Sequence, residues 1–360
     1  MTLTQPKETQ PKETQPKPPQ PEPGFLVGAV DDSVRHAGPA LEQLRAAGFR
    51  AVGITSYWQP GLTAPSEEEL ATLRDVAERA GDLRIFVAVF QPGSSTTPLT
   101  DEARGQLASY AASIVRDVPR IRDLIVGNEP NLNRFWMPQF DEAGGDVAAP
   151  AYYALLARAY DAVKAASPRT RVWGGALAPR GIDRPGTGRD THSPTAFIRD
   201  LGKAHRAGGR ERPPLDGFAY HPYPESSKVP PDRPTAAGTT TILLADYEEK
   251  LAPLLREAFG EDVPVLYSEL GVETSIPREK ASLYEGKEVA LPVDEATQAA
   301  FYRRAIRVAA CQEDVEGLLL FHSHDEPVLA GFQSGVYYVD GTPKASLAPV
   351  REAAERTMCR

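Results

Sequence analysis

The chain has 360 residues, of which 41% are hydrophobic and 25% charged, so it can bury a sizeable core and is not globally disordered. Its net charge of −9 argues against a nucleic-acid-binding protein, which would show a basic face. No apolar run approaches the roughly 18–20 residues that span a bilayer, and the N-terminus lacks the apolar segment of a signal peptide.

The first 23 residues are of low complexity. The sequence Thr-Gln-Pro-Lys-Glu occurs at 4–8 and again at 9–13, and prolines continue to Pro23. We interpret residues 1–23 as a disordered, Pro-rich linker and residues 24–360 as one catalytic domain. Such spacers often separate a domain from an export signal or wall anchor, which favours an extracellular or cell-surface location, with a cytoplasmic location as the alternative.

From Phe25 onward, apolar strand patterns alternate with helical patterns. The predicted strands are 25–30, 51–55, 84–90, 121–127, 171–176, 215–220, 263–268 and 315–321. The predicted helices are 40–47, one beginning at 66, one beginning at 100, 151–166, one beginning at 193, 240–259, 294–311 and 344–356. About eight strand–helix pairs predict a closed (β/α)8 TIM barrel.

A doubly wound open sheet is the rival fold. It predicts a glycine-rich phosphate loop after the first strand. Here Val30 is followed by Asp31 and Asp32, and nearly every predicted strand ends in polar or aromatic residues. This pattern favours the barrel, because the carboxyl ends of barrel strands carry the functional side chains.

Two of the predicted strands end in a glutamate. Strand 121–127 is followed by Asn128-Glu129-Pro130, and strand 263–268 is followed by Glu269. Cleavage of a glycosidic bond needs one carboxyl group that gives a proton and another that meets the oxocarbenium-like carbon. Opposite sides of one barrel mouth would place the pair around a sugar. The alternative is that each glutamate belongs to an unrelated loop ion pair.

These residues resemble clan A of the glycoside hydrolases, the retaining (β/α) barrels, over roughly residues 25–360. The resemblance implies that Glu129 is the general acid/base, that Glu269 is the nucleophile and that Asn128 binds the sugar 2-hydroxyl. It also implies that His221 and Tyr223 lie near the nucleophile, with the Tyr223 hydroxyl keeping Glu269 ionised. No cofactor or metal is implied, and the partner is a β-linked carbohydrate.

The chain departs from the family in two places. The family usually has a tryptophan at the end of strand eight, where this chain has Phe321 and His322, so we expect one of these to form the floor of the sugar site. The arginine often found on strand two is not identifiable here.

Other candidates for sugar contacts lie in loops after strands. Aromatic rings suit the apolar faces of sugars, and strand-end polar groups suit hydroxyls, although loop packing and a solvated rim are the alternatives. The candidates are Tyr57, Trp58, Phe135, Trp136, Asp31, Asp32 and Gln91. Trp173, early in its strand, is expected in the core. Arg180, Arg184 and Arg189 either favour an acidic sugar or form a solvated charged run.

Two further functions compete with a retaining glycosidase. A metal-dependent barrel enzyme acting on sugars would use neighbouring strand-end ligands. These are His221, Glu269, His322, His324 and Asp325. The other is a carbohydrate-binding barrel without turnover. A monomer is the default expectation, and neither the sugar nor the linkage can be deduced.

The two cysteines, Cys311 and Cys359, are placed by this assignment near the ends of the last two helices. Two free thiols are the simpler interpretation. A disulfide is the alternative, and it would tether the chain end and suggest an oxidising compartment.

Overall fold

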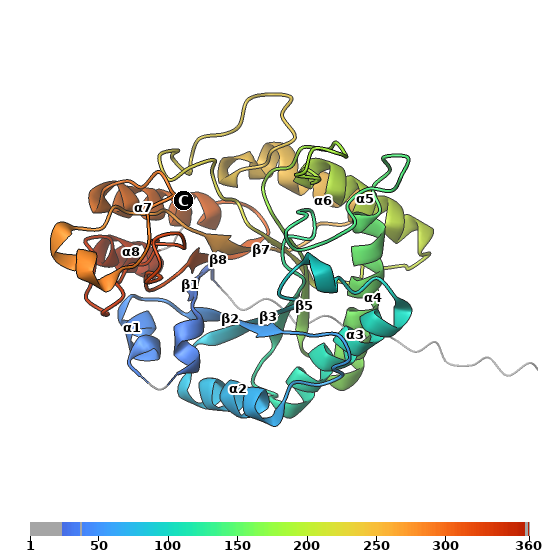
Figure 1. Cartoon of the computed structure of the whole chain (residues 1–360), viewed down its shortest axis with the longest axis horizontal. Helices are drawn as coiled ribbons and strands as arrows, with labels where there is room; N and C mark the ends of the chain where they lie inside the picture. The colour runs from blue at the N-terminus through green and yellow to red at the C-terminus, as the bar shows by residue number, and fades with distance from the viewer. Residues whose placement is uncertain (1–23, 37, 357–358, 360) are drawn as a thin grey trace, which may run out of the picture.

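The computed structural model describes residues 24–36, 38–356 and 359, and the predicted linker 1–23 lies outside them. Eight parallel strands form a closed barrel in the centre of the molecule (Figure 1), which confirms the predicted fold. Each strand pairs with the next, and Val30 of the first pairs with Phe321 of the last. The strands are β1 (Leu26–Val30), β2 (Ala51–Tyr57), β3 (Arg84–Phe90), β4 (Asp123–Val126), β5 (Arg171–Leu177), β6 (Gly217–Tyr220), β7 (Val265–Leu270) and β8 (Val315–Phe321).

The helices surround this ring (Figure 1). They are α1 (Ala40–Ala46), α2 (Glu67–Arg79), α3 (Asp101–Asp117), α4 (Ala148–Ala166), α5 (Pro194–Ala207), α6 (Ala252–Phe259), α7 (Glu295–Ala310) and α8 (Leu347–Glu355). None of the helices in the described part of the chain is long and apolar enough to cross a membrane.

Side-chain caps set several helix starts where the sequence predicted them. The Ser66 side chain accepts a hydrogen bond from Glu69 N–H at the start of α2, and Thr100 caps α3 in the same way. Ser193 caps α5 and Asp294 caps α7. Each cap satisfies a backbone N–H group that has no partner within its helix.

The predicted helix 240–259 is wrong in its first part. Helical structure starts only at Leu244, with a 3-10 turn (Leu244–Asp246) and a π-helical turn (Tyr247–Leu251) before α6. Ile242 N–H donates instead to Pro179 O at 3.0 Å, and Leu243 N–H donates to the Asp246 carboxylate at 2.8 Å. These bonds to other partners keep the preceding residues out of the helix.

The core has two parts. A large cluster lies between the strands and the helices. A smaller one fills the barrel interior around Trp173, which is completely buried, as predicted. Its indole Nε1 donates to Asp123 Oδ1 at 2.9 Å. Gly217 makes room for the ring, because a Cβ atom there would lie 2.4 Å from it. A (β/α)8 barrel holds its site at the carboxyl ends of the strands, beyond this packed interior.

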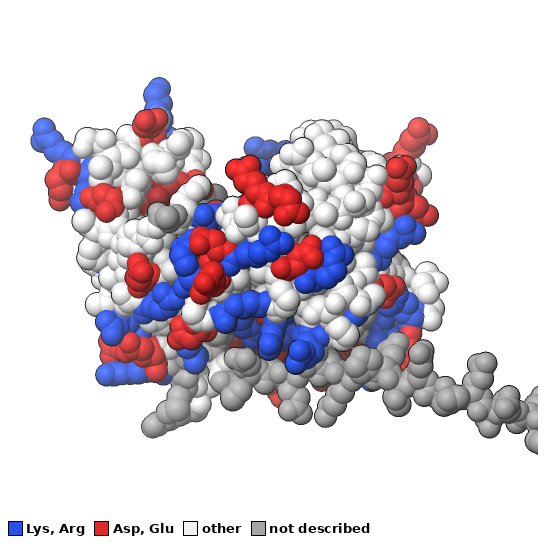
Figure 2. Space-filling view, turned by 90° about the horizontal axis from the view of Figure 1, so that it is seen from below, with Lys and Arg blue, Asp and Glu red and all other residues white. Residues whose placement is uncertain are grey.

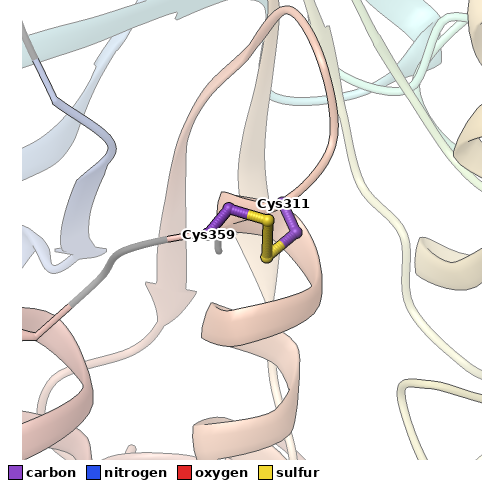
Figure 3. Close-up of a disulfide and its surroundings, with 2 residues drawn as sticks. All are labelled: Cys311 and Cys359. Atoms are coloured by element: carbon purple, nitrogen blue, oxygen red, sulfur yellow. A yellow bond between two sulfur atoms is a disulfide. The ribbon is translucent and has the colours of Figure 1, made fainter.

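Cys311 and Cys359 form a disulfide, so the interpretation of two free thiols is wrong. Figure 3 shows Cys359, beyond α8, bonded to Cys311 at the end of α7. The Cα atoms are 4.8 Å apart, within the range that a disulfide can bridge. The bond ties the end of the chain to the seventh helix of the ring.

Candidate active site

A cleft of about 1080 Å³ opens at the carboxyl ends of the strands, and both Glu129 and Glu269 line it. Figure 2 shows a side of the molecule whose upper edge is notched between two raised masses, with acidic and basic side chains interspersed over the face. Asn128, His221, Tyr223, Phe321 and His322 line the same cleft. The structure therefore brings together the residues that the family resemblance singled out.

Glu129 is turned into the cleft by an unusual stretch of backbone after β4. Gly127 has φ 90° and Glu129 has φ 40°, a region that side chains other than glycine seldom adopt. At Gly127 a Cβ atom would lie 2.7 Å from the Tyr152 ring, so only glycine fits. The Glu129 N–H group donates to Ala176 O at 2.8 Å, which fastens this turn to the end of β5.

Asn131 fixes the turn that carries Glu129. Its side-chain amide is completely buried. It donates to Ala178 O at 3.1 Å and to His192 O at 2.9 Å, and its oxygen accepts from Ala178 N–H at 3.0 Å. Because the amide satisfies three backbone groups, the loop that carries Glu129 is fixed to the loop after β5. The sequence analysis assigned Asn131 no role.

His221 lies between the two glutamates. Its Nδ1 atom is 3.1 Å from Glu129 Oε1, and its Nε2 atom is 3.7 Å from Glu269 Oε1. Tyr223, two residues further along, donates its hydroxyl to Glu269 Oε2 at 3.1 Å. The four side chains form one connected polar group. Such a group can pass a proton on one side and hold a carboxylate on the other.

Burial is the largest influence on Glu269 and raises the pKa of its carboxyl above the usual value. The charge on His221 and the hydrogen bond from Tyr223 act against that rise. For His221, burial alone lowers the imidazole pKa, but the carboxylates of Glu269 and Glu129 outweigh it, so the pKa is raised. The nucleophile expected from the resemblance therefore depends on its donors to stay ionised near neutral pH.

Phe321 and His322, at the end of β8 where the resemblance leads one to expect a tryptophan, both line the cleft. The two rings lie 3.7 Å apart between centroids, and Phe332 stands edge-on to Phe321 at 4.9 Å. His322 Nδ1 lies 2.8 Å from Val30 O, and its Nε2 lies 3.2 Å from Glu326 Oε1. Both ring nitrogens thus face oxygen acceptors, which favours the protonated form of the ring. Its pKa is raised by Glu326, against the effect of burial.

An aromatic wall stands on the β2–β4 side of the cleft. Tyr57, 52% exposed, meets Phe90 edge-on at 5.2 Å, and Phe90 meets Phe135 at 6.5 Å. All three residues line the cleft. The exposed ring of Tyr57 offers a face on which a sugar ring can stack.

Two tryptophans predicted to contact sugar do not line the cleft. Trp58 is completely buried and donates its indole N–H to Leu62 O at 2.8 Å. Trp136 is 1% exposed and packs against Tyr152 with ring centroids 5.8 Å apart. Both predictions are corrected, because the two rings belong to the large hydrophobic core.

Asp31 and Gln91 are also corrected. Gln91 is 3% exposed and donates to Phe135 O at 2.7 Å. Asp31 is buried against Ser323 and His324, whose hydrogen bonds outweigh burial and hold the pKa of its carboxyl well below the usual range. Neither residue lines the cleft, whereas Asp32, one position on, does.

The proposed metal ligands separate into two groups. His221, Glu269 and His322 line the cleft. His324 bonds Gln43 Oε1 at 2.9 Å, and Asp325 is buried in an ion pair with Lys344 at 2.7 Å. Within residues 24–36, 38–356 and 359, no group of three or more His, Cys, Asp or Glu side chains has an arrangement that could hold a metal ion. The donor set therefore does not fit the metal-dependent alternative.

Several residues that line the cleft were not predicted from the sequence. Glu326 and Phe332 come from the loop after β8, and Arg134 comes from the loop after β4. Glu273, which follows β7, also lines the cleft, and burial raises the pKa of its carboxyl to about 7. No local pattern marks these positions, since they reach the cleft only through the path of long loops.

The closed ring of parallel strands, with a cleft at their carboxyl ends, is the architecture of a (β/α)8 barrel. No protein-family model matches the chain, and no curated protein matches it by sequence. Solved glycoside hydrolases do share the fold. A family 39 glycoside hydrolase from Bacteroides cellulosilyticus WH2 matches with TM-score 0.65 and 19% identity, over 92% of this chain and 64% of its own. This chain thus spans less than two thirds of that protein.

Two GH5_18 proteins are also similar in structure. One, from Streptomyces cattleya, was solved in complex with Manb1-4GlcNAc and matches with TM-score 0.63 and 18% identity, over 94% of this chain and 82% of its own. The other, from Bifidobacterium longum subsp. infantis, matches with TM-score 0.60 and 18% identity, over 93% and 80%. At these identities the likeness establishes a shared fold.

Proposed function

We propose that this protein is a retaining glycoside hydrolase that cleaves β-glycosidic bonds of a polysaccharide or oligosaccharide by double displacement. The observation that carries the proposal is the connected group of Glu129, His221, Glu269 and Tyr223 in one cleft. The fold shared with solved glycoside hydrolases supports it.

In the first step, a carboxylate oxygen of Glu269 attacks the anomeric carbon while the bond to the leaving oxygen breaks. Glu129 gives its proton to that oxygen, and a glycosyl-enzyme ester remains on Glu269. In the second step, Glu129 takes a proton from water, and the water oxygen displaces Glu269 from the anomeric carbon. The sugar is released with its original anomeric configuration, and both glutamates return to their starting states.

The neighbours of the two glutamates suit these roles. Tyr223 donates to Glu269 Oε2, and this bond favours the ionised form of a buried carboxyl. His221 contacts Glu129 Oε1 and holds its orientation. Asn128, beside Glu129 in the cleft, would donate to the sugar 2-hydroxyl. Phe321 and His322 would form the floor of the subsite, in place of the family's tryptophan.

A panel of β-glucans, mannans, xylans and galactans first identifies the sugar that the protein hydrolyses. The test then compares Glu129→Ala and Glu269→Ala on the aryl β-glycoside of that sugar. We expect each variant to lose at least about 10²–10⁴-fold in rate. Azide should rescue both, giving a β-glycosyl azide with Glu129→Ala and an α-glycosyl azide with Glu269→Ala. The matched control is Glu225→Gln, which changes another cleft glutamate that takes no part in the proposed steps.

NMR of the first-formed product decides between mechanisms. Release of the β-anomer supports the proposal, and release of the α-anomer would contradict it. Tight glycan binding without turnover of any substrate would instead establish a non-catalytic carbohydrate-binding barrel.

We further propose that the protein works outside the reducing cytosol. The Cys311–Cys359 disulfide carries this proposal, since disulfides persist mainly in oxidising compartments. Thiol labelling of the denatured, unreduced protein from its native source tests it, and two reactive thiols would overturn it.

A further inference from the structure

Three arginines line one wall of the cleft. Arg134 comes from the loop after β4, and Arg180 and Arg189 come from the loop after β5. A β-bridge between Leu132 and Thr191 joins the two loops, and the buried Asn131 amide ties them together lower down. The three guanidinium groups therefore belong to one continuous wall.

This wall is basic. In the described part of the chain, none of the three arginines has a carboxylate oxygen within 4.0 Å. The two aspartates of the same loop are engaged with backbone: Asp183 accepts from Ser193 N–H at 2.6 Å, and Asp190 accepts from Thr187 N–H at 2.9 Å. In a chain with 49 acidic and 40 basic residues, an unpaired basic wall inside a cleft is a specific feature.

Arg180 is the anchored member of the three. It lies at the start of its loop and is half-buried. Its Nη2 atom donates to Pro224 O at 2.9 Å, which fixes the plane of the guanidinium group. Its Nη1 atom is buried and has no hydrogen-bond partner among the residues that the structure describes. A guanidinium group that is held in one orientation and has an unused N–H donor is suited to bind an oxyanion. The oxyanion can accept two parallel hydrogen bonds from it.

The position of the arginine wall indicates which part of a bound substrate would contact it. The wall adjoins Glu129, since Asn131 and Leu132 belong to the same turn. In the proposed function Glu129 protonates the departing oxygen, so the leaving sugar lies on this side. Of the other acidic residues that line the cleft, Glu225 follows Pro224, whose carbonyl accepts from Arg180, and Glu273 and Glu326 come from the loops after β7 and β8.

We propose that the cleft selects glycans that carry an oxyanion, a carboxylate or a sulfate, on the sugar that leaves, and that Arg180, assisted by Arg134 and Arg189, binds it. This inference rests on the proposed function for the identity of the leaving side. The charge complementarity itself requires only that a glycan occupies the cleft.

Binding to the Glu269→Gln protein tests the proposal without turnover. Calorimetry would compare β-linked oligosaccharides of equal length that are neutral, that carry a hexuronate at the reducing end, or that carry a sulfated hexose there. We expect at least one anionic ligand to bind about tenfold more tightly than the neutral one at low salt, and the advantage to shrink as salt is raised. The uronate and sulfate arms identify which oxyanion is preferred.

Variants in the same background identify the residue responsible. Arg180→Gln should remove most of the advantage of the anionic ligand over the neutral one. The matched control is Arg184→Gln, because Arg184 lies in the same loop but does not line the cleft. Thermal melting of each variant separates a loss of contact from a loss of fold, and Arg180→Lys provides a second, charge-preserving variant that should recover part of the advantage.

Equal binding of anionic and neutral ligands by the parent protein would overturn the proposal, and so would equal effects of Arg184→Gln and Arg180→Gln. Turnover of neutral glycosides without any anionic preference would contradict this inference alone. Anionic preference in binding, together with no hydrolysis of any glycoside, would contradict the proposed function and keep the binding site.

Discussion

The hydroxyl of Tyr223 lies 3.1 Å from Oε2 of Glu269, although the tyrosine follows β6 and the glutamate belongs to β7. The register between the two strands, in which Tyr220 pairs with Tyr267, brings them together. The contact opposes the rise in the Glu269 pKa that burial produces.

Replacing Tyr223 with phenylalanine should therefore lower the rate and shift its pH dependence. The lost hydrogen bond stabilises the ionised carboxylate, so the pKa of Glu269 should rise further, and the acid limb of kcat/KM should move to higher pH. We expect kcat at the pH optimum to fall about 10- to 100-fold. Tyr57→Phe, which changes a cleft tyrosine with no such contact, is the control. An acid limb that stays in place would contradict the assignment.

Asn131 offers a prediction about the support of Glu129. Asn131→Ala would leave three backbone groups without a partner, and each buried orphan costs about 1–3 kcal/mol. We expect a clear loss in the free energy of unfolding and a fall in kcat from displacement of Glu129. Asn131→Asp should be worse, because it turns a carboxylate toward two carbonyl oxygens. Urea unfolding together with single-turnover rates would reveal both effects, and unchanged stability in both variants would be inconsistent with the clamp.

Glu273 makes stability depend on pH near neutrality. Burial raises the pKa of its carboxyl from 4.5 to about 7, so the folded state holds its proton more tightly than the unfolded state. This group's contribution to stability is full below pH 4.5 and declines as the pH rises to about 7. Glu273→Gln should therefore be more stable than the parent at pH 8, by about 1 kcal/mol given that the side chain is partly exposed. Unfolding midpoints at pH 4.5 and pH 8 measure the effect, and an equal difference at the two values would refute it.

The disulfide between Cys311 and Cys359 closes a segment with a sequence separation of 48, which contains β8 and α8. Cys359→Ser should lower the free energy of unfolding by up to about 4 kcal/mol, because the unfolded chain gains the freedom of the opened loop. Activity at 25 °C should change little, since Cys311 precedes β8 and the cleft lies at the carboxyl ends of the strands. Reduction of the parent protein should reproduce the loss, and calorimetric melting with and without reductant checks it.

The strand ends were predictable because the local periodicity of apolar residues indicates where strands and helices alternate. Glu129 and Glu269 each follow an apolar run, and a closed ring leaves such residues only one end on which to meet. Tyr223 and His221 could be predicted only through the resemblance to a family. Their contacts with the glutamates depend on how β6 lies relative to β4 and β7, which the sequence does not display.

The four incorrect predictions of sugar-contacting residues have a common cause. Trp58, Trp136, Asp31 and Gln91 follow strands, as active-site residues do, yet all four point into loop or strand packing. Whether a strand-end side chain faces the cleft or the core changes from one residue to the next, as Asp31 and Asp32 illustrate. The composition of the chain and the order of its strands and helices do not predict which way each of these side chains points.

The sequence by itself determined the barrel and the two glutamates at its open end, because periodicity and strand termination are local properties. Only the tertiary structure decided that Arg134, Arg180, Arg189, Phe332 and Glu326 all line one cleft. It also decided that the two cysteines meet. Those outcomes depend on the paths of long loops, which are set by packing and hydrogen bonds between segments far apart in the chain.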